Sequence, residues 1–403
     1  MTASDASPAS LPGPLSDVTV VDLTRALAGP HATMMLGDLG ACVIKVESPG
    51  TGDDTRGWGP PFVAPESDEA GLGAESTYFL SANRNKQSIA LNLKEPGDLD
   101  ALRAMIARAD VLVENFRTGV LERLGLAPHA LLELNPRLIV LSITGFGHDG
   151  PEGGRAGYDQ IAQGEAGLMS ITGPNADEPQ KVGVPIGDLL AGMYGAFGIL
   201  AALHERGLTG RGQVVRTSLL ASVIGVHAFQ GTRWTVAGEV GHADGNHHVS
   251  IAPYGLFRCA DGAVQMAVGS ESLWQRFCVE FGVDAAREGF ATNPERVARR
   301  GETIALVEEA FADLPAAEVL RRLDEAGVPS GRVRTIDEVY AWEQTRSQGL
   351  LIDLEHETLG RIRVPGPPLR FFDAHGEETT RTAHTAPPVL DADHARLIEW
   401  ANS

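Results

Sequence analysis

Short apolar runs alternate with amphipathic stretches from Val18 onward. Apolar clusters predict buried strands at 18–23, 41–46, 88–93, 111–116 and 138–147. Helical apolar spacing lies between these runs, most clearly at 98–109, and again at 188–206. Because repeated strand–helix–strand alternation is typical of a parallel sheet covered by helices, we expect an α/β, Rossmann-like large domain.

The pattern changes near Gly238, where Gly, His and Asn gather without periodicity. Two short strand patterns joined at 260–262 and helical patterns over 273–326 then predict a second, smaller α+β domain. Strand-like pieces and a helix return after about 345. We expect a disordered leader at 1–12, a large domain at 13–225 completed by 345–403, a small domain at 226–330 and a linker at 331–344.

The chain carries 33 basic and 53 acidic side chains, for a formal net charge of −20. This charge argues against nucleic acid or an anionic membrane as a partner, since the overall field repels both. An anionic ligand would need local basic groups. The longest uncharged apolar stretch, 189–203, has 15 residues, fewer than the roughly 18–20 that span a bilayer, so we expect no membrane segment.

The three cysteines, Cys42, Cys259 and Cys278, lack the spacing of a disulfide framework or a zinc site. The N-terminal residues also lack the features of a signal peptide, so we expect a cytoplasmic protein. His242, His247 and His248 lie in a Gly- and Asn-rich loop, a setting that favours turns over metal ligation. We expect no metal site.

Gly145–Gly150 forms a literal G-x-G-x-x-G after a predicted strand. Dinucleotide binding requires this loop to open a helix, but Pro151, Gly153 and Gly154 follow at once. We therefore interpret it as a Gly-rich loop at a strand's carboxyl end. The sequence also lacks a G-x-S-x-G elbow, a P-loop and an H-E-x-x-H motif.

Asp188 precedes an apolar-periodic run and has the pattern of a helix N-cap. A functional role is compatible with that position, because a helix N-terminus favours an ionised carboxylate and the flanking Gly187 and Gly192 leave space. An ionised carboxylate can attack an activated acyl group. Lys86, Arg117 and Arg123 are candidates for phosphate binding, with solvated surface charges as the alternative.

Several long motifs together resemble the class III CoA-transferases, the group of formyl-CoA and carnitine CoA-transferases. They include LTRALAGPHATMMLGDLGACVIKVESPGTGDDTRGWGPPF, STYFLSANRNKQSIALNL, ADVLVENFRTGVLERLGL, RAGYDQIAQGEAGLMSITG and VGVPIGDLLAGMYGAFGILAALHERGLTGRGQVV. The resemblance extends from about Leu11 to Pro388. Its motifs look most like the branch that moves CoA from succinyl-CoA to dicarboxylates such as glutarate.

The resemblance implies an interlocked homodimer, acyl-CoA and a carboxylic acid as substrates, and no tightly bound cofactor. It implies that Asp188 is the nucleophile. By position in matching motifs, it places CoA at Arg25, Ala26, Leu27, Ala28, Asn83, Arg84, Asn85, Lys86, Asn115, Phe116, Arg117, Arg123, Tyr158 and Asp159. Ser48 stands where some members carry Arg, which puts one phosphate contact in doubt unless a neighbouring Arg replaces it.

Two alternatives remain at this stage. The related α-methylacyl-CoA racemase shares the fold and the aspartate, but it requires a His where this chain has Tyr158. A phenol with a pKa near 10 exchanges protons poorly at neutral pH, which favours the transferase. A catalytically silent CoA-binding protein would need Asp188 to serve as a cap only.

Overall fold

The computed structural model describes residues 12–65 and 73–403 and divides the chain into two compact units. The first combines residues up to Leu168 with Val182–Thr235 and Glu343–Ser403, and the second combines Met169–Lys181 with Val236–Trp342. The second unit thus includes 169–181, which the sequence analysis placed in the large domain, because the Gly245 N–H donates to the Gly173 carbonyl at 3.0 Å. The predicted leader, apart from Pro12, lies outside the described residues.

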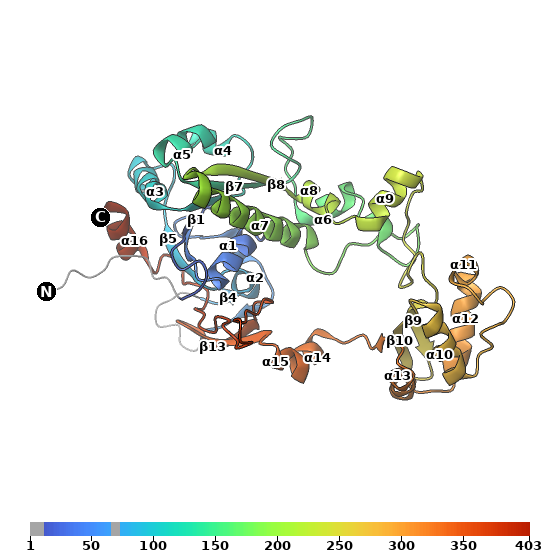
Figure 1. Cartoon of the computed structure of the whole chain (residues 1–403). Coiled ribbons are helices and arrows are strands. Elements are labelled where there is room, and N and C mark those ends of the chain that lie inside the picture. The colour runs from blue at the N-terminus through green and yellow to red at the C-terminus, as the bar shows by residue number, and fades with distance from the viewer. Residues whose placement is uncertain (1–11, 66–72) are drawn as a thin grey trace. The chain divides into compact units, whose positions relative to one another are not determined.

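A six-stranded parallel sheet with the order β5-β2-β1-β6-β7-β8 forms the centre of the first unit (Figure 1). Its strands are β1 (Thr19–Asp22), β2 (Cys42–Glu47), β5 (Lys86–Ala90), β6 (Val111–Glu114), β7 (Ile139–Thr144) and β8 (Gln213–Ser218). β6 is buried along its whole length, in keeping with its three consecutive apolar residues, Val111–Val113. The predicted parallel α/β layer is confirmed.

Helices cover both faces of this sheet. One apolar cluster joins the sheet to α1 (Ala28–Asp38), α6 (Asp159–Glu165), α7 (Ile186–Thr209) and α8 (Leu219–Ile224). The other joins it to α3 (Pro96–Arg108), α4 (Val120–Arg123), α5 (Pro128–Leu134) and α16 (His394–Asn402). Gly192 allows α1 and α7 to approach closely, because a Cβ there would lie 2.6 Å from the Ala28 carbonyl oxygen. Gly192 therefore serves helix packing and not, as the sequence suggested, space for a ligand.

The segment 391–402 closes the outer edge of the sheet. Asp391 accepts the Ala90 N–H at 2.7 Å, and Asp393 accepts the Ser88 N–H at 3.0 Å. Leu397 and Trp400 of α16 are buried in the core beside α3. The remaining elements of this unit are η1 (Asp54–Gly57), β3 (Phe62–Val63), β4 (Glu75–Ser76), α2 (Thr77–Ser81), α15 (Glu343–Ser347), β12 (Leu351–His356) and β13 (Gly360–Pro365), with α9 (Ala228–Ala237) crossing its boundary.

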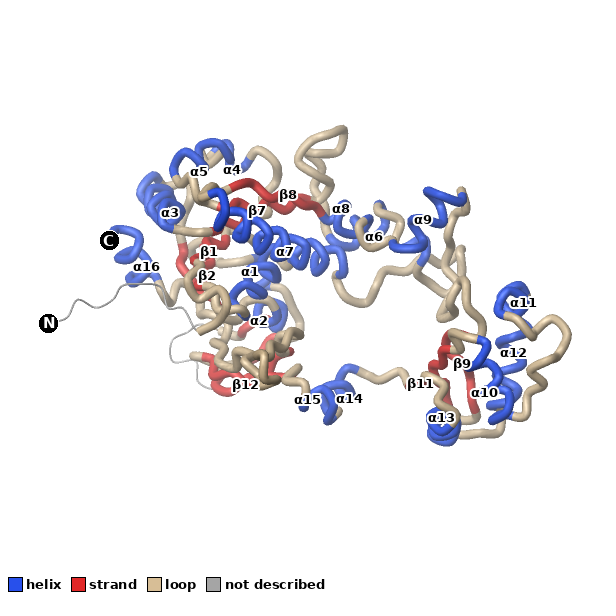
Figure 2. Tube along the Cα trace, in the orientation of Figure 1, coloured by secondary structure: helices blue, strands red, loops and turns tan. Residues whose placement is uncertain are grey.

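The second unit has its own three-stranded antiparallel sheet and apolar core. Figure 2 shows its strands beside α10, α12 and α13. Its elements are η2 (Met169–Ile171), β9 (Tyr254–Cys259), β10 (Gly262–Ala267), α10 (Glu271–Phe281), α11 (Asn293–Ala298), α12 (Arg300–Phe311), α13 (Ala316–Glu325), β11 (Ser330–Gly331) and α14 (Ile336–Ala341). Trp274, Phe277 and Phe311 are fully buried in its core. The predicted turn between β9 and β10 is confirmed.

Helix α7 is longer than the apolar stretch found in the sequence. It has 24 residues and a mean hydropathy of 1.6 over its most apolar 18 residues, enough by length and composition to cross a membrane. The uncharged stretch 189–203 lies inside this helix, which continues past Glu205 to Thr209. The expectation that the chain has no membrane segment stays a prediction. Length and composition alone are weak evidence for a membrane span, and α7 packs on α1, β7 and β8 as a core helix does.

Candidate active site

The strand order of the large sheet contains a reversal next to β1. The chain runs from β1 outward to β2 and β5, and then returns to the other side of β1 to add β6, β7 and β8. Ligands of open α/β sheets bind beyond the carboxyl ends of the strands at such a reversal. A cavity of about 500 Å³ lies there, lined by residues that follow β1, β6 and β7 and by the first turn of α7.

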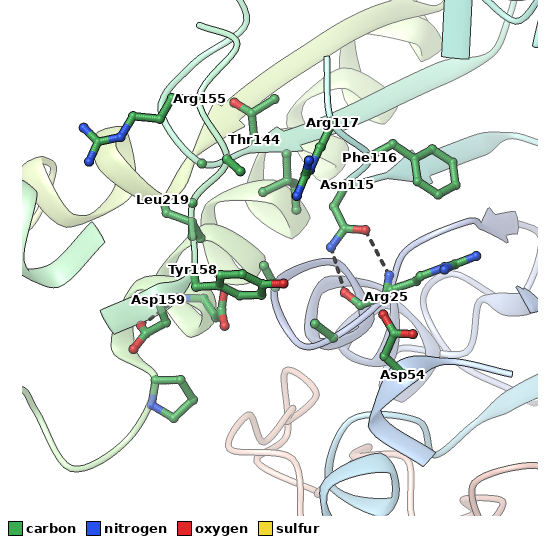
Figure 3. Close-up of a pocket in the computed structure, with 18 of the residues that line it drawn as sticks. Arg25, Asp54, Asn115, Phe116, Arg117, Thr144, Arg155, Tyr158, Asp159 and Leu219 are labelled. Carbon is green, nitrogen blue, oxygen red and sulfur yellow. Dashed lines mark hydrogen bonds between the residues drawn. The ribbon is translucent and has the colours of Figure 1, made fainter. Parts of the chain in front are cut away.

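The loops after β1 and β6 are held together by one amide. Asn115 accepts the Arg25 N–H at 2.9 Å and donates to the Arg25 carbonyl at 2.7 Å (Figure 3). Ala26 has a φ of 64°, an uncommon conformation for a residue with a side chain. The Arg25 guanidinium donates to the Ser48 hydroxyl at 2.7 Å. Arg25 therefore occupies the neighbourhood of the position where an arginine was missing from the sequence motif.

Asp188 lies in the first turn of α7 and lines this cavity. The prediction that it is the N-cap is wrong, because Pro185 occupies that position and the helix begins at Ile186. Within the described residues, no hydrogen bond engages the Asp188 carboxylate. Asp188 is the third residue of the helix, so its backbone is already helical and does not have the extended conformation of an N-cap residue.

Burial, and next the neighbouring carboxylate of Asp159, raises the pKa of Asp188 to about 7. The expectation from sequence was an ionised carboxylate favoured by the helix N-terminus. Loss of hydration and a like charge both disfavour the ionised form, and here they outweigh the helix dipole. A carboxylate with a raised pKa is a stronger nucleophile once it is ionised.

Two aromatic residues of the cavity were not singled out individually by the sequence analysis. Tyr78 and Trp58 line the cavity, with their rings edge to face at 5.1 Å between centroids. Burial raises the pKa of Tyr78 to about 12, and the charges of Asp188, Asp159 and Asp53 add to the effect. Tyr78 thus remains a neutral hydroxyl donor at neutral pH. Both lie within motifs of the family resemblance, which was the only signal available.

The cavity lining brings together many of the predicted site residues. Those that line it are Arg25, Ala26, Ala28, Asn115, Phe116, Arg117, Tyr158, Asp159 and Asp188. Five others are buried outside the lining: Leu27, Asn83, Arg84, Asn85 and Lys86. Arg123 is exposed on α4, also outside the lining. Contact of any of these residues with CoA stays a prediction.

The buried residues of the 83–86 segment have partners inside the protein. Arg84 pairs with Asp38. Lys86 pairs with Asp22 at 3.1 Å and donates to the Pro30 carbonyl and the Asn83 side chain, each at 2.9 Å. These bonds join β5 to β1 and α1.

The Gly-rich segment after β7 does not begin a helix. The next helix, α6, begins only at Asp159, so the structural context of a dinucleotide fingerprint is missing, as predicted. Gly145 lines the cavity, and a Cβ there would lie 2.6 Å from the Gly157 nitrogen. This glycine therefore permits two loops of the site to meet.

Within residues 12–65 and 73–403, no group of three or more His, Cys, Asp or Glu side chains is placed to hold a metal ion. His247 packs edge to face on Phe257, and His248 stacks on Tyr254, each about 5 Å between centroids. The histidine-rich loop thus contributes aromatic contacts in the second unit.

The fold and the cavity define an α/β protein with a cavity at a topological switch point of its sheet. The carboxyl of Asp188, in the first turn of α7, lines that cavity. The family model described as CoA-transferase family III matches residues 15–394, and the chain belongs to this family. The resemblance inferred from the motifs is confirmed. The protein is an enzyme that transfers CoA between an acyl-CoA and a carboxylate.

Characterised relatives align over most of the chain. Human succinyl-CoA:glutarate CoA-transferase is 39% identical over 96% of this chain and 85% of its own length. Succinate–glutarate CoA-transferase of Agrobacterium fabrum is 40% identical over 89% of this chain and 91% of its own. A crystal structure of a CAIB/BAIF family protein from Brucella suis matches with a TM-score of 0.84 at 36% identity, covering 97% of this chain and 100% of the other.

Proposed function

We propose that this enzyme moves CoA from a succinyl-CoA-type donor to a dicarboxylate through a covalent intermediate on Asp188. The observation that carries the covalent step is the position of the Asp188 carboxyl, which lines the cavity and has no hydrogen-bond partner among the described residues. The names of the succinate–glutarate relatives support the substrates.

The reaction begins when a carboxylate oxygen of Asp188 attacks the thioester carbon of the donor. The C–S bond breaks, CoA thiolate leaves and a mixed anhydride forms. The thiolate then attacks the aspartyl carbonyl, which releases the donor acid and leaves an aspartyl-CoA thioester. The acceptor carboxylate repeats these two steps in reverse order and regenerates Asp188. No proton is gained or lost, so the site needs anion stabilisation and exclusion of water more than acid–base catalysis.

The cavity offers groups suited to these steps. Arg25 and Arg117 line it and supply positive charge for the CoA phosphates or the distal carboxylate of a dicarboxylate. Tyr78 offers a neutral hydroxyl near Asp188. Tyr158 stands where a racemase needs a histidine, and its side chain is 66% exposed.

The test is chemical trapping. Incubation with succinyl-CoA and hydroxylamine, without acceptor, is expected to convert Asp188 to its hydroxamate, detected as a mass shift of the peptide that contains it. Borohydride is expected to reduce the same thioester. The Asp188→Asn variant, treated in parallel, should show neither product. Transfer by an enzyme that is never modified at Asp188 would rule out the covalent route.

We also propose that the enzyme is a homodimer, the interlocked form that the family resemblance implies. Met193, Phe197 and Leu200 lie on one face of α7, and Phe197 is 70% exposed. Together with Leu369 and Phe371 they line an apolar cavity. Apolar patches of this kind mark interfaces, and a second copy of the chain is the occupant proposed.

Light scattering on a sizing column is expected to give the mass of two chains. The Phe197→Glu variant is expected to shift the enzyme towards aggregates or single chains, because it buries a charge in the apolar contact. A wild-type enzyme that elutes as a single chain at micromolar concentration would contradict the dimer.

A further inference from the structure

Both carboxylate oxygens of Asp159 accept hydrogen bonds from other residues of the chain. Its Oδ1 accepts the Gly187 N–H at 2.7 Å and lies 3.4 Å from the Asp188 nitrogen. Both N–H groups belong to the first turn of α7, where helical N–H groups have no partner within the helix. Asp159 therefore supplies from α6 the cap that α7 lacks at Pro185, which has no side-chain cap bond.

A second residue fixes Asp159. Gln163 lies one turn further along α6, on the same face. Its Nε2 donates to Asp159 Oδ2 at 2.7 Å, and its Oε1 accepts the Val182 N–H at 2.9 Å. Gln163 is fully buried, and both the NH₂ and the oxygen of its amide bond to these partners.

The backbone of Gly187 lies very close to the Asp159 carboxylate. A Cβ at this position would lie 3.0 Å from Asp159 Oδ1, closer than most real contacts of a Cβ. The glycine before the nucleophile thus makes room for the Asp159 carboxylate, not for the substrate. Because Asp159 bonds to backbone atoms of α7, movement of Asp159 moves the residue that carries the reacting carboxyl.

We infer that Asp159 is a positioning residue that holds the first turn of α7, and with it the Asp188 carboxyl, against the reaction cavity, and that Gln163 locks it in place. This role differs from the CoA contact that the family resemblance implied for Asp159. The inference rests on the proposed covalent function of Asp188. The like charge of Asp159 also contributes to the raised pKa of Asp188.

The Asp159→Asn variant tests this role. The new amide can still accept the Gly187 N–H through its oxygen, but its NH₂ group then faces the NH₂ group of Gln163. We expect kcat and the rate of Asp188 trapping to fall by about 10- to 100-fold, since small misplacements of reacting groups cost this much. The dissociation constant of CoA, measured by calorimetry, is expected to change by less than about twofold.

The double variant Asp159→Asn with Gln163→Glu supplies the rescue. The amide NH₂ introduced by the first substitution can donate to one oxygen of the carboxylate introduced by the second. The other carboxylate oxygen can accept the Val182 N–H, so every bond has a donor and an acceptor again. We expect the double variant to recover much of the lost trapping rate, and Gln163→Glu alone to be impaired because two acceptors would face each other. Circular dichroism and melting curves exclude unfolded variants from the comparison.

The pH profile separates positioning from simple structural support. Removing the like charge of Asp159 is expected to lower the pKa of Asp188, so the trapping rate of Asp159→Asn should reach its half-maximum at lower pH than that of the wild type. An unchanged midpoint together with failed rescue, or weaker CoA binding with an unchanged trapping rate, would overturn the inference. If wild-type Asp188 is never trapped, the proposed covalent function fails. The role of Asp159 is then decided by kcat and by the dissociation constant of CoA, both measured on Asp159→Asn.

Discussion

The Asp188→Asn variant is expected to lose at least about 10³-fold in kcat for CoA transfer, while it continues to bind CoA. The amide has nearly the shape of the carboxyl but cannot form the anhydride. Because the Arg25–Asn115 contacts do not involve Asp188, the rest of the cavity should be preserved. Steady-state kinetics and calorimetry with CoA measure the two effects separately.

Glu205→Gln is the matched control for this variant. Glu205 is an exposed carboxylate on the same helix and bonds only to the Gln213 side chain among the described contacts. Its neutralisation should leave kcat within about twofold of the wild type. Retention of more than about a tenth of the activity by Asp188→Asn would show that this carboxylate is not the nucleophile.

The Asp188→Asn variant should also differ from the wild type in how its stability depends on pH. Because the folded pKa of Asp188 is raised to about 7 from 3.8, the folded protein holds a proton there that the unfolded chain has lost. Stability therefore falls as pH rises between these values, by up to about 4 kcal/mol if the site is fully shielded from solvent. Asp188→Asn removes this cost, so it should melt at a higher temperature than the wild type at pH 8 and at a similar one at pH 4.

Lys86→Met is expected to lower the free energy of unfolding by about 3–5 kcal/mol, the typical cost of removing one partner of a buried ion pair. Lys86 and Asp22 are both inaccessible to solvent, and Asp22 also accepts bonds from the Thr24 and Thr33 hydroxyls. Burial lowers the pKa of Lys86 to about 8, although Asp22 favours its charged form. The variant leaves the charge of Asp22 uncompensated by its nearest cation.

CoA affinity distinguishes this structural role from the predicted phosphate contact. We expect the folded fraction of Lys86→Met to bind CoA with an affinity close to that of the wild type, because Lys86 is outside the cavity lining. Lys94→Met, which removes an exposed lysine close by in the chain, should change stability by less than about 0.5 kcal/mol. A stable Lys86→Met protein with greatly weakened CoA binding would instead support the predicted phosphate contact.

The large sheet could be predicted from sequence because its signal is local. Runs such as Val111–Glu114 are apolar over almost their whole length and are separated by helical spacing. The start of α7 was harder to place, since Pro185 and Asp188 both suit the beginning of a helix and only the backbone decides between them. Because the helix begins at Ile186, Asp188 is not the N-cap, and its carboxyl has no hydrogen-bond partner among the described residues.

The site was predicted only in part for a different reason. Residues that follow strands, such as Arg25 and Asn115, can be assigned to the carboxyl edge of a sheet from sequence. The burial of Lys86 could not, because its partner Asp22 lies 64 residues away and neither residue carries a local signal of the pair. The contact of Asp159 with Gly187 likewise depends on how α6 and α7 meet.

The bonds between Asp391, Asp393 and the edge strand β5 affect how the protein is made. Before residues 391–393 are synthesised, we expect β5 to expose the N–H groups that Asp391 and Asp393 accept in the folded chain, and an unpaired strand edge can template association with other chains. The segment that covers this edge is synthesised only after the intervening chain, since Asp391 lies 301 residues beyond Ala90. We therefore expect nascent chains to need a chaperone over this interval. A variant that lacks residues 391–402 should aggregate more than the wild type, while the molecules that stay folded keep their catalytic activity.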